Sequence, residues 1–454
     1  MTLKKIILSI CLAGFTAILF LAPEASAFLW FSRKETKPVS SAPAVEIKKT
    51  LTLKDAYALA LARSETIAIQ GAMIEEAHGR FYEACSVILP TVNFSMTRFD
   101  QDATPKGESG GGSGGEGASS NLLRPSTPQK KFTFHQPLFS GFKEFAALAA
   151  GGADNKGQEL RYRRAKELLW LDVADSFYAL LQAEQDVAIL KETEDIMEKR
   201  INDLRAREKI GRSRPSEAQS AIADQKLAEA ELVSARGTER MARELFEFYI
   251  GRSLEQELLD DLDLQQQLSD PLYYLSKSDK RADVCAAEQD YILAQKKVIS
   301  AQSGFFPSVY LDGNYYTQRV GFQSGIDWDT TLTFNVPIFD GMETIGKVRE
   351  SASQKDQARL QWEKTRRLAA LEIQQKYDSF RAGLEEEEAY NAARQAAQEN
   401  YRLQAEDYKL NLVNNLNVLD ALRRYKEIYR DWNVSYYETK KNYWALKVAS
   451  GEIE

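Results

Sequence analysis

The residues that could do chemistry in this chain are few and poorly placed for it. His78 and His135 are the only histidines among 454 residues, and neither belongs to a defensible metal-ligand pattern with Cys, Asp or Glu. Asp172 and Asp175 could pair as acid and base, but they lie in charged helical sequence, where solvated surface is the better interpretation. We therefore predict no enzymatic activity, no cofactor and no metal site.

One glycine-rich stretch formally matches a nucleotide-binding motif. Residues 110–115 read GGGSGG, which satisfies G-x-G-x-x-G. Such glycines cradle a pyrophosphate only where they join a strand to the helix that follows it, and that context is missing here. A low-complexity loop is the better interpretation. A nucleic-acid partner has no electrostatic support either, because the formal net charge is −7.

The first 27 residues have the three parts of a secretory signal peptide. Lys4 and Lys5 precede an apolar run over 6–21, and 25–27 read Ala-Ser-Ala, an A-x-A cleavage site. A retained membrane anchor is disfavoured because the run is short and Pro23 follows it. No Cys follows the cleavage site, so no lipid anchor is expected. The segment predicts export past the inner membrane of a bacterium.

Two parts of the chain repeat each other. FHQPLFSG at 134–141 returns as FNVPIFDG at 334–341, an offset of 200, and LPTVNF at 89–94 resembles FPSVYL at 306–311, an offset of 217. The Gly/Ser-rich insert 107–120, present only in the first copy, accounts for most of the difference. This indicates a tandem duplication. The predicted organisation is a signal peptide (1–27), an N-terminal linker (28–50), a first structural repeat (51–251), a connector (252–280) and a second structural repeat (281–454).

Each copy follows one order of elements. A helical segment ends before a proline (52–88 in the first copy), two strands of alternating polarity follow, and a long helix begins after the repeated motif. In the first copy that helix should run from about Phe142 to Ile210 and return from Pro215; in the second, Asp340 and Glu343 fit a capping box at its start. The fold class is mostly α with four strands per chain. An aromatic girdle is predicted at Phe132, Phe134, Phe139, Tyr315 and Trp328.

The number of predicted strands indicates whether one chain can span a membrane alone. No uninterrupted apolar run of twenty residues follows the signal peptide, so any membrane-spanning part must be built from strands, which close into a barrel in lipid. One chain offers four strands, whereas single-chain outer-membrane barrels need at least about eight. The prediction is therefore an oligomer whose copies share one transmembrane β-barrel.

Several motifs together resemble the TolC family of outer-membrane efflux proteins. They are LPTVNF and FFPSVYL, QPLFSG and VPIFDG, LTLKDAYALAL (51–61), NLNVLDA (415–421) and the terminal ASGEI, and the match extends over about 51–453. The resemblance implies a homotrimer in the lipid of the outer membrane, with a twelve-stranded β-barrel and a long α-helical barrel across the periplasm. It also implies docking to an inner-membrane transporter through a periplasmic adaptor protein.

The resemblance further implies where the adaptor binds and where the channel is gated. Both functions belong to the tips of the two helical hairpins, which here are Gly211, Arg212, Ser213, Asn411, Leu412 and Val413. Gly211 matches the tip glycine of the family, and Asn411 departs from it, although Asn also tolerates left-handed backbone angles. Glu217 and Asp420 are the nearest candidates for acidic entrance residues. The basic first tip departs from a strongly cation-selective entrance.

The function predicted on this basis is an outer-membrane exit duct of a tripartite efflux system that passes small molecules to the exterior. One alternative keeps the architecture but assigns the protein to type I secretion of a polypeptide. A second alternative is a periplasmic coiled-coil scaffold without a pore, and the alternating strands argue against it.

Overall fold

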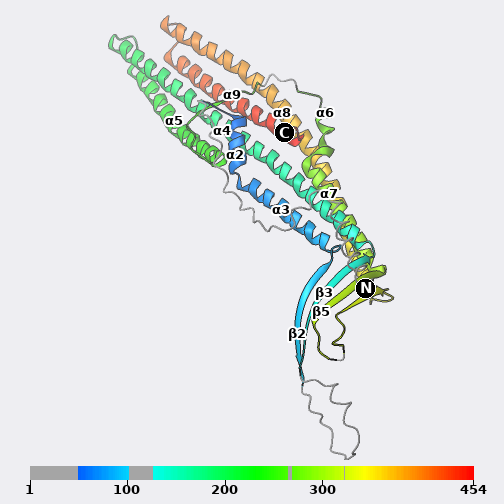
Figure 1. Cartoon of the computed structure of the whole chain (residues 1–454). Helices are drawn as coiled ribbons and strands as arrows, with labels where there is room; N and C mark the ends of the chain where they lie inside the picture. The colour runs from blue at the N-terminus through cyan, green and yellow to red at the C-terminus, as the bar shows by residue number, and fades with distance from the viewer. Residues whose placement is uncertain (1–49, 102–125, 264–267, 322, 454) are drawn as a thin grey trace, which may run out of the picture. The chain divides into compact units, whose positions relative to one another are not determined.

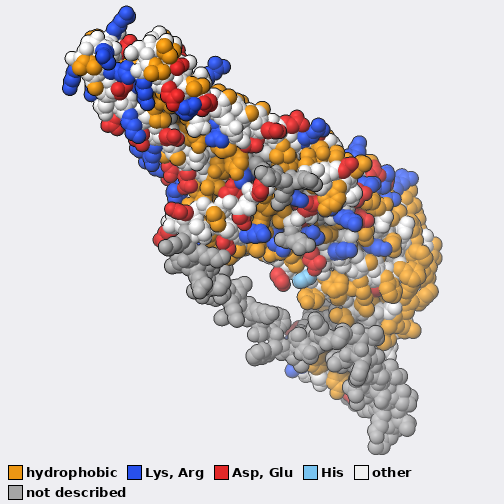
Figure 2. Space-filling model, turned by 90° about the horizontal axis from the view of Figure 1, so that it is seen from above, with side chains coloured by type: hydrophobic (Ala, Val, Ile, Leu, Met, Phe, Trp, Pro, Cys, Tyr) orange, Lys and Arg blue, Asp and Glu red, His pale blue; other side chains and the backbone are white. Residues whose placement is uncertain are grey.

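A computed structural model describes residues 50–101, 126–263, 268–321 and 323–453. The predicted signal peptide, the linker up to residue 49 and the glycine-rich insert lie outside the described residues. The described part is mostly helical with some strands, as predicted (Figure 1). Figure 2 shows charged side chains of both signs spread over its helical hairpins.

Two helical hairpins dominate the described residues. In the first, α4 (Lys143–Lys209) returns as α5 (Pro215–Ile250); in the second, α8 (Glu343–Lys409) returns as α9 (Asn415–Ala449). The helices α4 and α8 have 67 residues each, or about 100 Å at 1.5 Å per residue, which confirms the long helix predicted after Gly141. Among the described residues, no helix combines the length and apolarity needed to cross a bilayer.

The start of α8 corrects one prediction. Met342 is its N-cap residue at φ 70° and makes no side-chain capping bond, so Asp340 and Glu343 do not form a capping box. Gly341 and Met342 both have left-handed backbone angles, and these delay the helix by two residues. The Asp340 carboxylate instead accepts a hydrogen bond from the backbone N–H of Thr344 at 2.9 Å.

The helical segment predicted over 52–88 is confirmed, and the structure adds an interruption within it. It is divided into α2 (Leu53–Arg63) and α3 (Glu65–Ser86). Ser64 has extended backbone angles (φ −61°, ψ 116°), and its hydroxyl accepts a hydrogen bond from the N–H of Ile67. A serine at this position can therefore end one helix and cap the next. The corresponding part of the second half contains α6 (Pro271–Leu275), α7 (Ala282–Gln302) and two 3₁₀ turns, Ser278–Lys280 and Ser303–Phe305.

Four strands form one antiparallel sheet in the order β2-β3-β5-β6, with β2 (Thr91–Asp100) and β6 (Trp328–Asn335) at its edges. Its central strands are β3 (Ser126–Ser140) and β5 (Ser308–Gln318). A short parallel sheet of β1 (Thr50–Thr52) and β4 (Glu257–Leu259) was not predicted, because each strand has three residues and their sequence separation exceeds 200.

The two hairpins of the large sheet have the same register. Thr91 lies opposite His135, and Ser308, 217 residues after Thr91, lies opposite Asn335, 200 residues after His135. A slip of one residue would move every side chain to the other face of the sheet, so equal registers give both hairpins the same two faces. These are the faces that the alternating sequences predict.

One face of this sheet carries a continuous aromatic row. Phe94 lies opposite Phe132, Phe132 opposite Tyr315, and Tyr315 opposite Trp328, so the row crosses all four strands. Three of the five predicted girdle residues belong to this row, and Phe134 lies on the same face of β3. Phe139 differs: its ring packs edge-on against Phe142, with centroids 5.2 Å apart, where the sheet joins α4.

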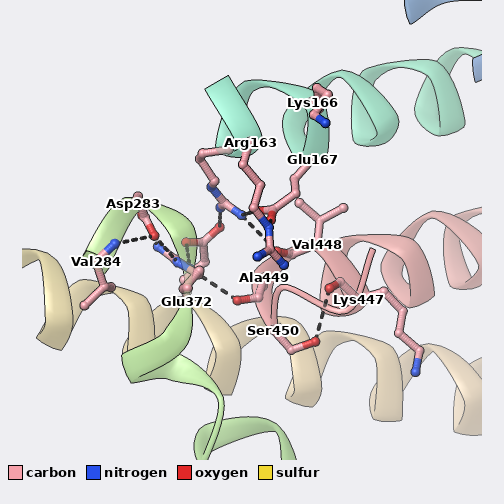
Figure 3. A network of polar contacts seen from close by, with 12 residues as sticks. Arg163, Lys166, Glu167, Asp283, Val284, Glu372, Lys447, Val448, Ala449 and Ser450 are labelled. Carbon is pink, nitrogen blue, oxygen red and sulfur yellow. Dashed lines mark hydrogen bonds and ion pairs between the residues drawn. The ribbon is translucent and has the colours of Figure 1, made fainter. Parts of the chain in front are cut away.

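Buried guanidinium groups attach the C-terminal end of α9 to the rest of the protein (Figure 3). Arg164 donates to the carbonyl of Val448 at 2.9 Å, and Arg281 donates to Glu372 at 2.7 Å and to the carbonyl of Ala449. The last carbonyls of a helix lack partners within it and carry partial negative charge, so both arginines stabilise this end. A few residues further on, Glu452 accepts hydrogen bonds from Lys277 and Lys447.

Candidate functional site

The two hairpin turns have the same backbone conformation. Gly211 donates its N–H to Glu208 and Arg212 donates to Arg207, which is the Schellman arrangement of a helix C-terminus. In the second hairpin Asn411 donates to Tyr408 and Leu412 to Asp407 in the same pattern. Asn411 has φ 60° and Gly211 has φ 70°, so asparagine adopts the left-handed conformation that glycine adopts in the first turn.

The structure locates the predicted tip residues at one end of the two hairpins (upper left in Figure 1). Gly211, Arg212, Asn411 and Leu412 are exposed, and Leu412 retains 70% of its accessible surface. Ser213 and Val413 are half-buried.

The two predicted acidic residues are both engaged by neighbours. The Ser213 hydroxyl donates to Glu217 at 2.8 Å, and Asp420 accepts from Arg423 at 3.3 Å. Glu217 is half-buried in the first turn of α5, and Asp420 is exposed on α9. The structure therefore brings Ser213 and Glu217 together, whereas Glu217 and Asp420 belong to different hairpins and each binds a residue of its own.

A group of four residues that the sequence did not reveal joins the hairpins near their ends. The guanidinium carbons of Arg200 and Arg207 on α4 lie 3.7 Å and 4.6 Å from the ring centroid of Tyr408 on α8. Arg200 also donates from Nε to Asn415 Oδ1 on α9 at 2.9 Å. Tyr408 is 6% exposed and Asn415 is 2% exposed. We call Arg200, Arg207, Tyr408 and Asn415 the tip clasp.

The tip clasp occurs where the two copies differ. At the offset of 200, Tyr408 corresponds to Glu208 and Asn415 corresponds to Pro215. The half-buried Arg200, between a tyrosine ring and an amide, makes a cation–π contact and a charge-assisted hydrogen bond. Burial lowers the pKa of Arg200 from its ordinary value, and electrostatic interactions with Tyr408, Asp203 and Tyr401 oppose that effect. Comparison of the two copies for such differences is the sequence signal that could have found this group.

Further contacts continue the junction along the hairpins. Arg423 on α9 pairs with Asp224 on α5 at 3.1 Å, Lys426 pairs with Glu231, and Arg430 pairs with Asp186 on α4 at 2.6 Å. Beneath these pairs lies an apolar cluster drawn from all four helices. Its buried members are Met197, Ile201, Leu204, Ala218, Ala221, Ala397, Tyr408, Val418, Leu419, Leu422 and Tyr425.

This arrangement can hold two helical hairpins together, and its chemistry is that of packing and ion pairing. Arg423 is exposed, so its ion pair contributes at most about 1 kcal/mol. Lys426 is buried and pairs with the half-buried Glu231, so this pair, the tip clasp and the apolar cluster are the main contacts of the junction. Across the residues that the structure describes, no group of three or more His, Cys, Asp or Glu side chains could hold a metal ion.

Comparisons with known proteins agree with this architecture. A profile described as "Outer membrane efflux protein" matches residues 56–252 and 277–446. Outer membrane protein OprJ of Pseudomonas aeruginosa is 27% identical over 150 residues, which are 32% of this chain and 31% of OprJ. The antibiotic efflux pump outer membrane protein ArpC of Pseudomonas putida is 30% identical over 149 residues, again 32% of this chain and 31% of ArpC. The match thus spans about a third of these curated relatives.

A solved structure extends the likeness in three dimensions. The outer membrane protein VceC from Vibrio cholerae superimposes with a TM-score of 0.75 over 88% of this chain and 96% of VceC, at 18% identity. At that level of identity the likeness shows a shared fold.

Proposed function

Because this chain belongs to the outer membrane efflux protein family, we propose that it is the exit duct of a tripartite efflux system. The family is one of outer-membrane transport proteins, so the chain is located in the outer membrane and is not an enzyme. Small molecules would pass through it from a pump complex in the periplasm to the exterior. ArpC is named for antibiotic efflux, which supports small molecules rather than secreted polypeptides as cargo.

The observation that carries this proposal is a two-faced sheet with two unpaired edges. Four strands with one apolar and one polar face cannot close on themselves, and β2 and β6 each present an unpaired row of backbone groups. Three copies would supply twelve strands, with β6 of each copy beside β2 of the next. The result is a homotrimeric barrel with the aromatic row toward lipid and the polar face toward water.

The contact between β3 and β5 within one chain serves as a template for the contact between copies. Thr133 lies opposite Asn314 in that contact. The offset of 200 relates Thr133 on β3 to Thr333 on β6, and the offset of 217 relates Asn314 on β5 to Thr97 on β2. The proposed trimer therefore has Thr333 of one copy opposite Thr97 of its neighbour, on the polar face of the barrel.

The junction of sheet and helix supports the same closure. A Cβ atom on Gly141 would lie 2.7 Å from the Ser303 carbonyl oxygen, because the chain packs tightly there. Gly341 has nearly the same φ (65° against 67°) but nothing within 4 Å, and the nearby Ile338 is 96% exposed. The offset of 217 relates Ser303 to Ser86, so Ser86 of a neighbouring copy is the residue proposed to cover Gly341.

A cysteine cross-link tests the trimer and its register. With Cys85 and Cys285, both free thiols, replaced by Ser, the pair Thr97→Cys and Thr333→Cys should give covalent dimers and trimers after oxidation in membranes. The matched control moves one cysteine by a single residue, Arg98→Cys with Thr333→Cys, which directs the two side chains to opposite faces. Equal cross-linking of both pairs, or a monomer that still conducts ions in a planar bilayer, would contradict the proposal.

In this proposal, the hairpin ends form the periplasmic entrance of the duct. The tip clasp holds the first hairpin against the second, and separation of the hairpins would widen the entrance. A periplasmic adaptor that binds at Gly211, Arg212 and Ser213 and at the equivalent turn of α8 and α9 could shift this equilibrium if it prefers the separated state. The adaptor would connect the duct to an inner-membrane transporter, which supplies the energy.

A further inference from the structure

The two hairpin ends carry different charges in equivalent sequence windows. Residues 205–217 contain five cationic side chains and two carboxylates, whereas 405–417 contain one lysine and two carboxylates. The first end therefore has a formal charge of +3 and the second of −1, although both turns share one backbone conformation. The cations of the first end are Arg205, Arg207, Lys209, Arg212 and Arg214.

Most of these cations are not paired with acidic side chains among the described residues. Arg205, Lys209, Arg212 and Arg214 are exposed, and none of the four forms an ion pair with any described residue. Other exposed arginines of the long helices do find acids: Arg359 binds Glu363, Arg381 binds Glu385 and Arg402 binds Glu399. Figure 2 shows Lys and Arg side chains at this end of the molecule (upper left). Like charges gathered at a turn repel one another, so fold stability does not account for the cluster.

The second end exposes more apolar side chains than the first, where Ile210 is 66% exposed. Leu410, Leu412 and Leu416 are each more than half exposed. At the offset of 200, Leu412 corresponds to Arg212 and Leu416 corresponds to Ser216. A partner that touches both ends therefore meets a cationic surface at one and an apolar surface at the other.

We infer that the cationic end of the first hairpin, residues 205–217, binds an acidic surface of the periplasmic protein that docks on the duct. This inference rests on the proposed function, because it specifies the chemistry of the partner at the proposed docking site. Carboxylates opposite the four unpaired cations would supply the missing ion pairs and steer the encounter. The contact also distinguishes the first hairpin end from the second, so a ring of six hairpin ends would be recognised with threefold rather than sixfold symmetry.

An anionic membrane surface could also attract these cations, but it fits the pair of ends less well. A lipid surface presents the same chemistry to both ends, whereas the two ends differ at equivalent positions such as Arg212 and Leu412. A folded partner can present carboxylates to Arg212 and Arg214 and apolar side chains to Leu412 at the same time. The observations therefore favour a protein.

Photo-cross-linking in cells of the source bacterium tests the inference. The photoreactive residue benzoylphenylalanine is placed at Ser216, which is exposed next to the cations, and the peptide joined to it is sequenced. We expect a protein adduct whose cross-linked segment is rich in Asp and Glu. Reversal of two charges, Arg212→Glu with Arg214→Glu, should lower the adduct yield about tenfold or more, because like charges then face each other.

A matched pair on the same hairpin controls for net charge. Arg236→Glu with Arg240→Glu reverses two exposed cations on α5 that also form no ion pair with described residues, and it should leave the yield unchanged. A single reversal, Lys209→Glu, should give an intermediate loss. An adduct with lipid, an adduct with a neutral or basic segment, or an equal yield from both reversed pairs would overturn the inference.

Bilayer conductance of the same purified variants separates this inference from the proposed function. If conductance persists while the adduct contradicts an acidic partner, the docking chemistry is wrong and the duct stands. If the parent protein neither conducts nor forms trimers, the proposed function itself fails.

Discussion

Replacement of Arg200 by Ala should open the proposed entrance of the duct. Arg200 contacts the Tyr408 ring at 3.7 Å and donates to Asn415 at 2.9 Å, and both partners are nearly fully buried. The substitution removes a partly desolvated cation–π contact worth about 1–2 kcal/mol. It also removes a hydrogen bond from a charged group, worth about 1.5–3 kcal/mol, and leaves the buried amide of Asn415 without that donor.

These two losses overlap, because Arg207 stays near the Tyr408 ring at 4.6 Å and replaces part of the contact. We therefore expect a net cost of about 2–4 kcal/mol per subunit. At about 1.4 kcal/mol for each factor of ten, the lower figure already raises the separated population about thirtyfold. Asn415→Ala should have a smaller effect in the same direction, since it leaves both ring contacts in place.

The measurement is the open probability of single channels in planar bilayers, with the amount of trimer checked on gels. Arg205→Ala is the matched control, because Arg205 is exposed five residues further along α4 and has no ion-pair partner among the described residues. A double-mutant cycle of Arg200→Ala with Tyr408→Leu should show a coupling of at least about 0.5 kcal/mol. An open probability equal to that of the control in intact trimers, or additive single effects, would refute a clasp that keeps the hairpins together.

Two further predictions concern the closure of the ring and its C-terminal anchor. Gly341→Ala should impair trimer formation about as much as Gly141→Ala impairs folding, although the isolated chain leaves open space around Gly341. A gel assay of trimer yield measures this effect. An unchanged trimer yield in Gly341→Ala would contradict the proposed contact with Ser86 of a neighbouring copy. Burial alone would raise the pKa of Glu452, but hydrogen bonds from its two lysine partners outweigh it and lower the pKa. A lowered carboxylate pKa means that this stabilisation is present above the ordinary pKa of glutamate and is lost as the pH falls through the folded value. The protection factor of the Gly451 amide, which is its intrinsic exchange rate divided by its observed exchange rate, should therefore fall below about pH 4 in the parent protein and much less in Glu452→Gln.

The equivalence of the two hairpins of the sheet is the part of the fold that the repeats in the sequence predicted in most detail. Offsets of 200 and 217 between the copies correctly relate the pair Thr91 and His135 to the pair Ser308 and Asn335. This works because side chains alternate with a period of two, so a preserved apolar pattern leaves no freedom to slip. The long helices were predicted for the same reason, since their apolar residues recur along one face.

Features set by neighbouring elements were beyond the sequence argument. The motifs around Pro137 and Pro337 are nearly identical, yet β3 continues to Ser140 while β6 ends at Asn335, because β3 pairs on both sides and β6 on one. The interruption at Ser64 is local but weak, since serine is tolerated inside helices as well as at their caps. The tip clasp joins residues more than 200 positions apart, and a tyrosine near a helix end gives no sign of the arginines that will surround it.

The positions where the two copies disagree carry the argument for how a partner recognises the duct. Equal residues at equivalent positions, such as Gly141 and Gly341, can make the same contact six times around a trimeric ring, and that is the requirement for closing it. Contacts with a partner of lower symmetry need different residues at equivalent positions. A partner could otherwise dock on a ring with six equal ends in six equivalent orientations. The substitution of Arg212 by Leu412 and of Glu208 by Tyr408 at equivalent positions removes this ambiguity. If exchanging the two tip sequences, 210–214 and 410–414, left docking and conductance unchanged, the difference between the copies would have no role in recognition.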